Sequence, residues 1–271
     1  MLFILPFDHR SSFCKLLGFE YPVNKKQAKV VARMKNIVFD AFLEARKQVD
    51  RPDEHAILVD EEFGSAILKK ARRQKIRFAQ TVEKSGQKVF DFDYGADFGK
   101  RLLKFKPEFA KALVRYNPNQ HAVNKTQNAK LKKLSRFCRQ NHIKLMLEVL
   151  VEGKGDRSAL VTRSIKQIQK AGVDPAIWKI EGLEKVSDWR AVRRETDDPA
   201  IVLGRGESRH EVEKWIKTAA KSGDATGFAI GRTIFAKPIA DYAAHKIDRE
   251  TAVEKISNNY LHFINLWERL V

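Results

Sequence analysis

The sequence predicts an α/β fold, a single eight-stranded (β/α)8 barrel, or TIM barrel, over residues 1–271. Short apolar runs alternate with helical patterns eight times, which is typical of a parallel sheet covered by helices. A chain of 271 residues fits eight such units as a closed barrel better than as an open sheet. Polar residues gather after the strands, and no linker rich in Pro, Gly or Ser divides the chain.

Each predicted strand is a short apolar run that ends at polar residues or glycine, and each predicted helix carries apolar residues at helical spacing. The predicted strands cover 2–7, 56–59, 76–81, 109–116, 144–151, 177–180, 200–203 and 227–230. The predicted helices cover 24–49, 65–74, 96–105, 125–141, 157–171, 185–195, 210–222 and 249–270. Asn24 is a suitable N-cap for the first helix. Residues 89–95 are expected to be irregular.

The charge and apolar content limit the classes of partner. The formal net charge is +18, yet Lys and Arg are spread along helical patterns and no RNA-binding motif occurs. We therefore expect no nucleic-acid partner, and a surface that attracts phosphorylated small molecules. No apolar run approaches the roughly 18 residues of a membrane span, so no membrane association is expected. Residues 1–7 lack the basic region and cleavage site of a signal peptide.

The cysteines and histidines predict no metal site. Cys14 and Cys138 show no metal-binding spacing and favour a reducing cytoplasm. No HxH or HExxH spacing occurs, so we expect neither a zinc ion nor another cofactor. The sequence leaves the oligomeric state open and is compatible with a homo-oligomer.

Barrel enzymes build their sites at the C-terminal ends of the strands, which is where the polar residues of this chain fall. The residues at these positions are Asp8, His9, Arg10, Asp60, Glu61, Lys84, Arg115, Asn117, Glu148, Lys179, Glu181, Arg205 and Arg232. The concentration at one end of the predicted barrel indicates a site there.

Two opposite charges stand inside apolar strands, Glu148 in the fifth and Lys179 in the sixth. A lone charge in apolar surroundings is costly unless it is paired or neutralised. Burial favours a neutral amine, which can attack a ketone and form a Schiff base. Glu148, one strand away, could move the protons. The alternatives are a structural ion pair, or a Lys179 side chain that extends out of the barrel.

Lys111 lies within the fourth strand, two residues before Leu113 and four before Arg115. Residues 111, 113 and 115 share one face of the strand. If that face points into the barrel, Lys111 lies low in the site and Arg115 nearer the rim. The alternative is a solvent-facing lysine at the start of the strand.

Glycine–arginine turns follow the last two strands, Gly204-Arg205-Gly206 and Gly231-Arg232. Barrels commonly bind phosphate there through backbone N–H groups, and arginine adds charge-assisted hydrogen bonds. The turns predict a phosphate site, with solvated arginines in tight turns as the alternative.

Several stretches resemble the aldolase-like domain of unknown function that is fused to the C-terminus of 5-dehydro-2-deoxygluconokinase in many bacteria. The matching stretches are LPFDHR at 5–10, LVDEEFG at 58–64, LVRYNPN at 113–119, KIEGLE at 179–184 and GFAIGR at 227–232. That domain is similar in turn to class I tagatose-bisphosphate aldolases. The resemblance implies a class I aldolase-like barrel, and no kinase domain is present in this chain.

The resemblance implies roles for individual residues. Glu148 and Lys179 match the glutamate and lysine that do the chemistry, Asp8 with Arg10 an Asp-x-Arg, Lys111 a strand-four lysine and Arg232 a phosphate-loop arginine. Gly204-Arg205-Gly206 departs from the Ser or Ala with Gly of the relatives. In inositol catabolism the implied substrate is 2-deoxy-5-keto-gluconate 6-phosphate, cleaved to dihydroxyacetone phosphate and malonate semialdehyde.

The leading hypothesis is a metal-independent carbon–carbon lyase, a Schiff-base aldolase for a phosphorylated keto-sugar or sugar acid. Its predicted catalytic residues are Lys179, Glu148, Asp8 and Lys111. Its predicted substrate- or phosphate-binding residues are Arg10, Asp60, Arg115, Asn117, Gly204, Arg205, Gly206, Gly231 and Arg232. One alternative is a barrel isomerase or epimerase with Glu148 as base, which would give no borohydride-trappable adduct. The other is a non-catalytic binding or regulatory barrel.

Overall fold

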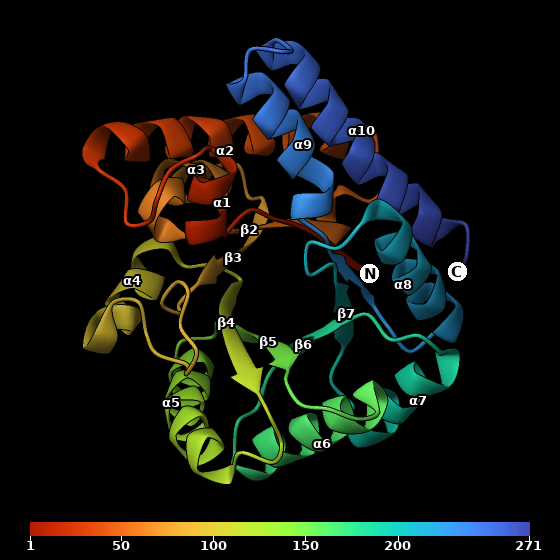
Figure 1. Ribbon diagram of the computed structural model, residues 1–271. Coiled ribbons are helices and arrows are strands. Elements are labelled where there is room, and N and C mark those ends of the chain that lie inside the picture. The colour runs from red at the N-terminus through yellow and green to blue at the C-terminus, as the bar shows by residue number, and fades with distance from the viewer.

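The computed structural model describes all 271 residues and confirms the predicted TIM barrel. Eight parallel strands pair in sequence order, and β1 pairs with β8 to close the barrel. The strands are β1 (Leu2–Pro6), β2 (His55–Val59), β3 (Arg77–Thr81), β4 (Phe109–Tyr116), β5 (Lys144–Val151), β6 (Ile177–Glu181), β7 (Ala200–Leu203) and β8 (Gly227–Ala229). Figure 1 shows them in the centre with the helices around them.

Ten α-helices surround the barrel, and eight of them overlap the predicted ones. They are α1 (Ser11–Leu16), α2 (Lys25–Arg46), α3 (Glu61–Arg73), α4 (Phe98–Phe105), α5 (His121–Gln140), α6 (Arg157–Lys170), α7 (Val186–Glu195), α8 (Arg209–Ser222), α9 (Arg232–Ala243) and α10 (Arg249–Glu268). Two 3-10 turns complete the set, η1 (Pro52–Glu54) and η2 (Gly95–Asp97). The sequence did not predict α1 or α9. None of the helices is both long and apolar enough to cross a membrane.

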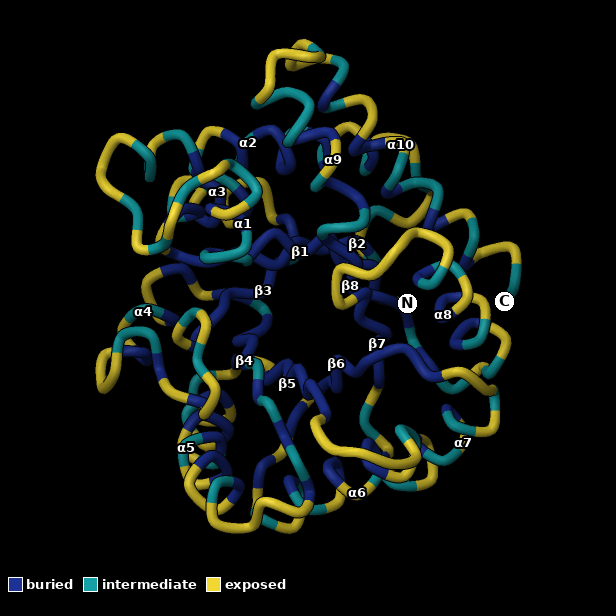
Figure 2. The backbone as a smooth tube through the Cα atoms, viewed as in Figure 1, coloured by how far each residue is buried: buried dark blue, intermediate teal, exposed yellow.

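The core has two parts, and the strands separate them. The larger part lies between the strands and the helices, where buried backbone forms an inner ring and exposed segments lie outside (Figure 2). The smaller part fills the inside of the barrel. It consists of Leu2, Ile4, Ala56, Leu58, Ala79, Phe109, Met146, Ile177, Ile201 and Ala229. This apolar interior is the floor on which the polar mouth is built.

Strand alternation carries the inward face from this floor up to the mouth. Side chains two residues apart along a strand point to the same face of a sheet. Met146 and Ile177 belong to the interior cluster and pair in the β5–β6 register. Two residues further on, Glu148 pairs with Lys179. The register therefore places these two charges side by side, above the floor.

Candidate active site

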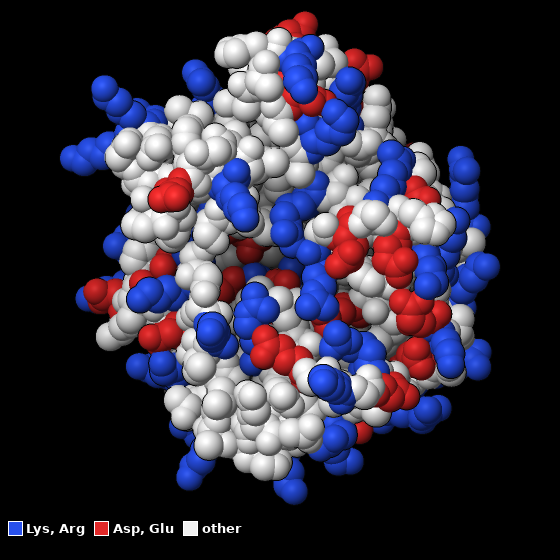
Figure 3. All heavy atoms as spheres, viewed as in Figure 1, with Lys and Arg blue, Asp and Glu red and all other residues white.

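A cavity of about 300 Å³ opens at the C-terminal mouth of the barrel. Most of its lining is polar or charged. Its cationic residues are Arg10, Lys84, Lys111, Arg115, Lys179, Arg205 and Arg232, and its carboxylates are Asp8, Glu83 and Glu148. In Figure 3 the blue side chains gather around the central hollow and red ones lie within it. The excess of cations over carboxylates favours an anionic ligand.

Lys179 and Glu148 form a buried pair at the bottom of the cavity. Lys179 Nζ donates a hydrogen bond of 2.6 Å to Glu148 Oε2. Lys179 is 5% exposed and Glu148 6%. Burial alone would raise the pKa of Glu148, but the cations of Lys111 and Lys179 lower it to about 2. Glu148 is therefore an ionised carboxylate at neutral pH, in contact with Lys179 of the neighbouring strand β6.

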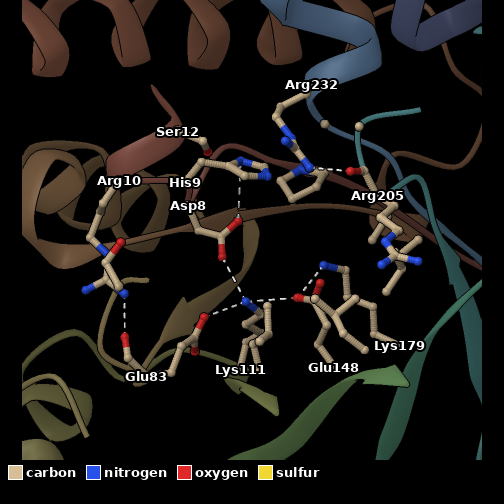
Figure 4. A pocket seen from close by; sticks show the side chains of 18 of the residues that line it. Asp8, His9, Arg10, Ser12, Glu83, Lys111, Glu148, Lys179, Arg205 and Arg232 are labelled. Carbon is tan, nitrogen blue, oxygen red and sulfur yellow. Dashed lines mark hydrogen bonds and ion pairs between the residues drawn. The ribbon is translucent and has the colours of Figure 1, made fainter. Parts of the chain in front are cut away.

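Lys111 is surrounded by carboxylates (Figure 4). Its Nζ donates to Asp8 Oδ2 at 3.1 Å and to Glu83 Oε1 at 2.6 Å. The same nitrogen lies 2.9 Å from Glu148 Oε2. An ammonium group has three N–H donors, and here it faces three carboxylates. Of the two positions that the sequence left open for Lys111, the structure shows the inward one, since the residue lines the cavity and is 2% exposed.

The electrostatics separate the two lysines. Burial opposes the charge of Lys111, but Asp8, Glu148 and Glu83 outweigh it and raise its pKa well above the ordinary value. For Asp8, burial acts to raise the pKa, but Lys111, His9 and Lys179 hold it below its usual range. Lys111 is therefore a permanent cation, whereas Lys179 has a single carboxylate partner within ion-pair distance. Of the two, Lys179 is better suited to act as a nucleophile.

Arg10 lies at the edge of the cavity but is already paired. Its Nη1 donates 2.6 Å to Asp93 Oδ2, and its Nη2 donates to the backbone carbonyl of Glu83. Burial opposes its charge, yet Glu83 and Asp93 raise the pKa of the guanidinium. Arg10 thus ties the end of β1 to the segment that follows β3. Arg10 forms no ion pair with Glu148, whereas Lys111 does.

Sequence reasoning missed Glu83 as a site residue. It follows β3 and is 6% exposed, and its backbone forms an isolated antiparallel bridge with Phe92. A signal was present, because Ala79, Thr81 and Glu83 continue the alternation that begins at the interior cluster. Burial raises the pKa of Glu83, and Asp8 adds to this against the pull of Lys111 and Arg10.

His9 also lines the cavity, although its sequence position pointed only to the rim. Its Nδ1 lies 4.0 Å from Asp8 Oδ1, and its ring packs edge-on against Phe235 of α9. Burial lowers the pKa of His9 to about 4, with Asp8 opposing and Arg232 assisting. The imidazole is therefore neutral at pH 7.

The turns after β7 and β8 meet through Arg232. Its Nη2 donates to the backbone carbonyl of Arg205, and its Nε is buried without a hydrogen-bond partner. Arg205 and Gly206 both have left-handed backbone angles, with φ of +52° and +84°. A Cβ on Gly206 would lie 2.4 Å from Arg232 Cζ, so the absence of a side chain at this glycine leaves room for the guanidinium group. The Arg205 side chain pairs instead with Glu181, at 2.6 Å.

Gly204, Gly206 and Gly231 line the cavity with these arginines, and α9 begins at Arg232. The first N–H groups of a helix have no partner within the helix and can bind an anion. Gly231 and Arg232, at this helix start, both line the cavity. The structure thus brings together the residues that the sequence assigned to phosphate.

Two predicted site residues, Asp60 and Asn117, do not line the cavity. Asp60 is fully buried, pairs with Lys35 and caps α3 by accepting from Phe63 N at 2.8 Å. Asn117 shapes the turn after β4, where its Oδ1 accepts from Asn119 N at 3.0 Å. Both side chains are committed to local structure, which corrects their assignment to substrate binding.

Arg115 does reach the cavity, nearer the rim than Lys111. It lies 3.7 Å from Glu152, and both side chains are substantially exposed. The chain contains no group of three or more His, Cys, Asp or Glu residues arranged to hold a metal ion.

Fold and site define a TIM-barrel protein with a buried lysine–glutamate pair at its mouth. The chain belongs to the family described as "Uncharacterized protein conserved in bacteria (DUF2090)", which matches residues 1–271. No curated protein matches the sequence significantly.

Solved structures share the fold at low sequence identity. A protein from Corynebacterium glutamicum has a TM-score of 0.60 and 16% identity, over 96% of this chain and 85% of the other. An archaeal fructose 1,6-bisphosphate aldolase has a TM-score of 0.59 and 13% identity, over 95% and 94%. A Schiff base forming fructose-1,6-bisphosphate aldolase has a TM-score of 0.57 and 13% identity, over 91% and 94%. At these identities the likeness concerns the barrel fold.

Proposed function

We propose that the chain is a class I aldolase, a carbon–carbon lyase that forms a Schiff base through Lys179. The observation that carries the proposal is the contact between Lys179 Nζ and Glu148 Oε2, with Lys111 sharing the same carboxylate oxygen. Two structural neighbours with the same fold are fructose-bisphosphate aldolases, and one of them forms a Schiff base. They support the proposal through the fold that they share with this chain.

The chemistry follows from the three side chains at the bottom of the cavity. The neutral amine of Lys179 attacks a substrate ketone, and a carbinolamine forms. Glu148, 2.6 Å away, takes a proton from the Lys179 ammonium group before the attack and returns it to the carbinolamine hydroxyl, which leaves as water and gives the iminium. The iminium then withdraws the electron pair of the adjacent carbon–carbon bond. Lys111 supplies a fixed positive charge that compensates Glu148 when Lys179 gives up its proton.

The lining of the cavity favours a phosphorylated keto-sugar or sugar acid. We assign a phosphate group to the space between the Gly204–Gly206 turn and the start of α9, where Arg232 Nε has no hydrogen-bond partner. The resemblance to the domain fused to 5-dehydro-2-deoxygluconokinase supports 2-deoxy-5-keto-gluconate 6-phosphate as the substrate. On this proposal the protein acts in inositol catabolism, in the cytoplasm.

Borohydride trapping tests the proposal. The protein is incubated with dihydroxyacetone phosphate, 2-deoxy-5-keto-gluconate 6-phosphate or fructose 1,6-bisphosphate and reduced, and the adduct is located by peptide mass spectrometry. We expect a reduced adduct on Lys179 that is absent from Lys179→Ala. Lys144→Ala, an exposed lysine of β5, is the control and should trap as wild type does.

The outcomes separate the alternatives. An adduct on Lys111 would identify Lys111, the other lysine in contact with Glu148, as the nucleophile. Turnover of a phosphorylated sugar without any adduct would point to an isomerase or epimerase that uses Glu148 as base. If the protein neither turns over any of these sugars nor forms an adduct with them, the aldolase assignment is contradicted.

A further inference from the structure

Asp8 and Glu83 are the carboxylates of the cavity that have no role in the chemistry of Lys179, and of these two only Glu83 has a buried oxygen without a partner. Its Oε1 contacts Lys111 Nζ at 2.6 Å, while Glu148 Oε2 contacts the same nitrogen at 2.9 Å. The second oxygen of Glu83, Oε2, is buried and has no hydrogen-bond partner. A buried carboxylate oxygen without a partner is costly unless it carries a proton or receives one from a ligand. Glu83 lines the cavity, so a turn of its side chain would present this oxygen to a bound substrate.

The charges around Lys111 make a proton on Glu83 favourable. Three carboxylates, Asp8, Glu83 and Glu148, face two lysines in this cluster. When Lys179 becomes neutral to attack a ketone, three negative charges would surround the single cation of Lys111. A proton held by one of the carboxylates reduces this imbalance. Glu83 has the free oxygen at which such a proton can sit.

The groups packed against Glu83 act in different directions. Lys111 of β4 and Arg10 after β1 favour its charge, whereas Asp8 and burial oppose it. The net effect raises the pKa of Glu83, while the pKa values of Asp8 and Glu148 lie below their ordinary range. Of the three carboxylates, Glu83 therefore takes up a proton at the highest pH, which suits a group that exchanges protons with a hydroxyl.

We infer that Glu83 is a further catalytic residue, which exchanges the proton of the substrate hydroxyl at the carbon–carbon bond that breaks. The inference rests on the proposed aldolase function. In cleavage the Glu83 carboxylate accepts the hydroxyl proton, and the O–H electron pair becomes the second bond of the new carbonyl. The carbon–carbon electron pair moves into the iminium and gives an enamine on Lys179. Glu148 takes up a proton from solvent water and protonates the enamine carbon, Glu83 gives its proton to solvent, and hydrolysis of the resulting iminium releases the ketone.

In the reverse direction protonated Glu83 donates to the aldehyde oxygen as the new bond forms. The two carboxylates that contact Lys111 thus have separate roles. Glu148 transfers protons at the imine of Lys179, and Glu83 transfers the proton of the hydroxyl oxygen that becomes the aldehyde oxygen. Lys111 stabilises whichever of the two is ionised. The division predicts that the imine half-reaction can continue without Glu83.

The test compares Glu83→Gln with wild type in two assays. One assay follows borohydride trapping of dihydroxyacetone phosphate and exchange of its C3 hydrogen with D2O by NMR. The other follows cleavage of whichever sugar wild type cleaves fastest, among 2-deoxy-5-keto-gluconate 6-phosphate, fructose 1,6-bisphosphate and tagatose 1,6-bisphosphate. We expect trapping and exchange within a few fold of wild type and cleavage slower by about 100-fold or more. Asp91→Asn, an exposed carboxylate of the same segment, should match wild type in both.

The trapping assay also shows that Glu83→Gln folds and keeps Lys179 reactive. Cleavage at the wild-type rate would overturn the inference. An equal loss in both assays would also overturn it, because Glu83 would then only position Lys111. If wild type itself gives neither an adduct nor exchange, the aldolase proposal has failed, and that result is separate from any behaviour of the variant.

Discussion

Glu148 Oε2 lies 2.6 Å from Lys179 Nζ because β5 and β6 pair in a register that sets the two residues opposite each other. The same register pairs Met146 with Ile177 on the apolar floor below. A shift of either strand by one residue would turn its own charge toward the helices and break the pair. The packing of the floor therefore fixes the geometry of the pair.

We predict that Glu148→Gln keeps part of the borohydride trapping but slows turnover by roughly 100-fold or more, the usual effect of losing a general acid–base group. The amide keeps the size of the side chain and can still accept a hydrogen bond, so Lys179 stays in place. Steady-state kinetics and trapping yields on one preparation check this. Unchanged turnover would remove Glu148 from the reaction.

A second prediction concerns stability and pH in Lys111→Met. The change leaves Asp8, Glu83 and Glu148 buried without their common cation, so we expect a loss of about 3 to 5 kcal/mol in the free energy of unfolding at pH 7. In wild type the depressed pKa of Glu148, about 2 against an ordinary 4.5, stabilises the fold above pH 4.5. That contribution is lost as the pH falls toward 2.

In the variant, burial without the cation raises the pKa values of the three carboxylates. Their protonation as the pH falls therefore increases the free energy of unfolding of the variant. The difference between wild type and variant should therefore shrink as the pH falls from 7 to 4.5. Urea unfolding at the two pH values measures it. The same difference at both would assign the loss to packing and not to charge.

The phosphate proposal gives a third prediction. Arg232→Ala should raise KM for a phosphorylated substrate by roughly 10- to 100-fold, the scale of a hydrogen bond to a charged group. Gly206→Ala should do much the same without removing a charge, because its Cβ would lie 2.4 Å from Arg232 Cζ and its φ is +84°. Gly223→Ala, at a glycine with φ +71° whose Cβ meets nothing within 4 Å and which does not line the cavity, separates backbone strain from displacement of the arginine. Unchanged KM in Arg232→Ala would place the phosphate elsewhere.

The barrel was predictable from the sequence because its signals are local. Apolar runs ending in polar residues mark the strands, and amphipathic spacing marks the long helices. Helix α1 escaped because six residues are too few to show a period. Helix α9 escaped because Pro238 lies within it. Its buried face, including Ile234, Phe235 and Ile239, keeps the helix despite the lost hydrogen bond.

The site was predictable where strand alternation continues past the floor, as at Lys111, Glu148 and Lys179. Glu83 was missed because it lies beyond the end of β3, in a segment held by Arg10 through contacts that are remote in sequence. Asp60 was placed in the site because it follows a strand. An Asp at a strand–helix junction is equally typical of an N-cap, and the structure shows that it is one.

The last prediction follows from the role of Asp60. Its Oδ1 pairs with Lys35 Nζ, its Oδ2 caps α3, and both side chains are almost inaccessible to solvent. Lys35 also lies 5.4 Å from the ring centres of Phe13 and Phe63, so its surroundings are apolar apart from Asp60. Asp60→Ala leaves a buried ammonium group without a counter-ion. We expect it to lower the free energy of unfolding by about 3 to 5 kcal/mol.

Loss of the cap adds roughly 1 kcal/mol, and Asp60→Asn separates the two effects because an asparagine still caps a helix. The double variant Lys35→Met with Asp60→Asn should recover much of the loss, since neither an unpaired charge nor an open helix end remains. Urea unfolding measures all four proteins. KM should stay at the wild-type value in Asp60→Asn, because the side chain does not line the cavity. A large rise in KM with unchanged stability would instead return Asp60 to the substrate site.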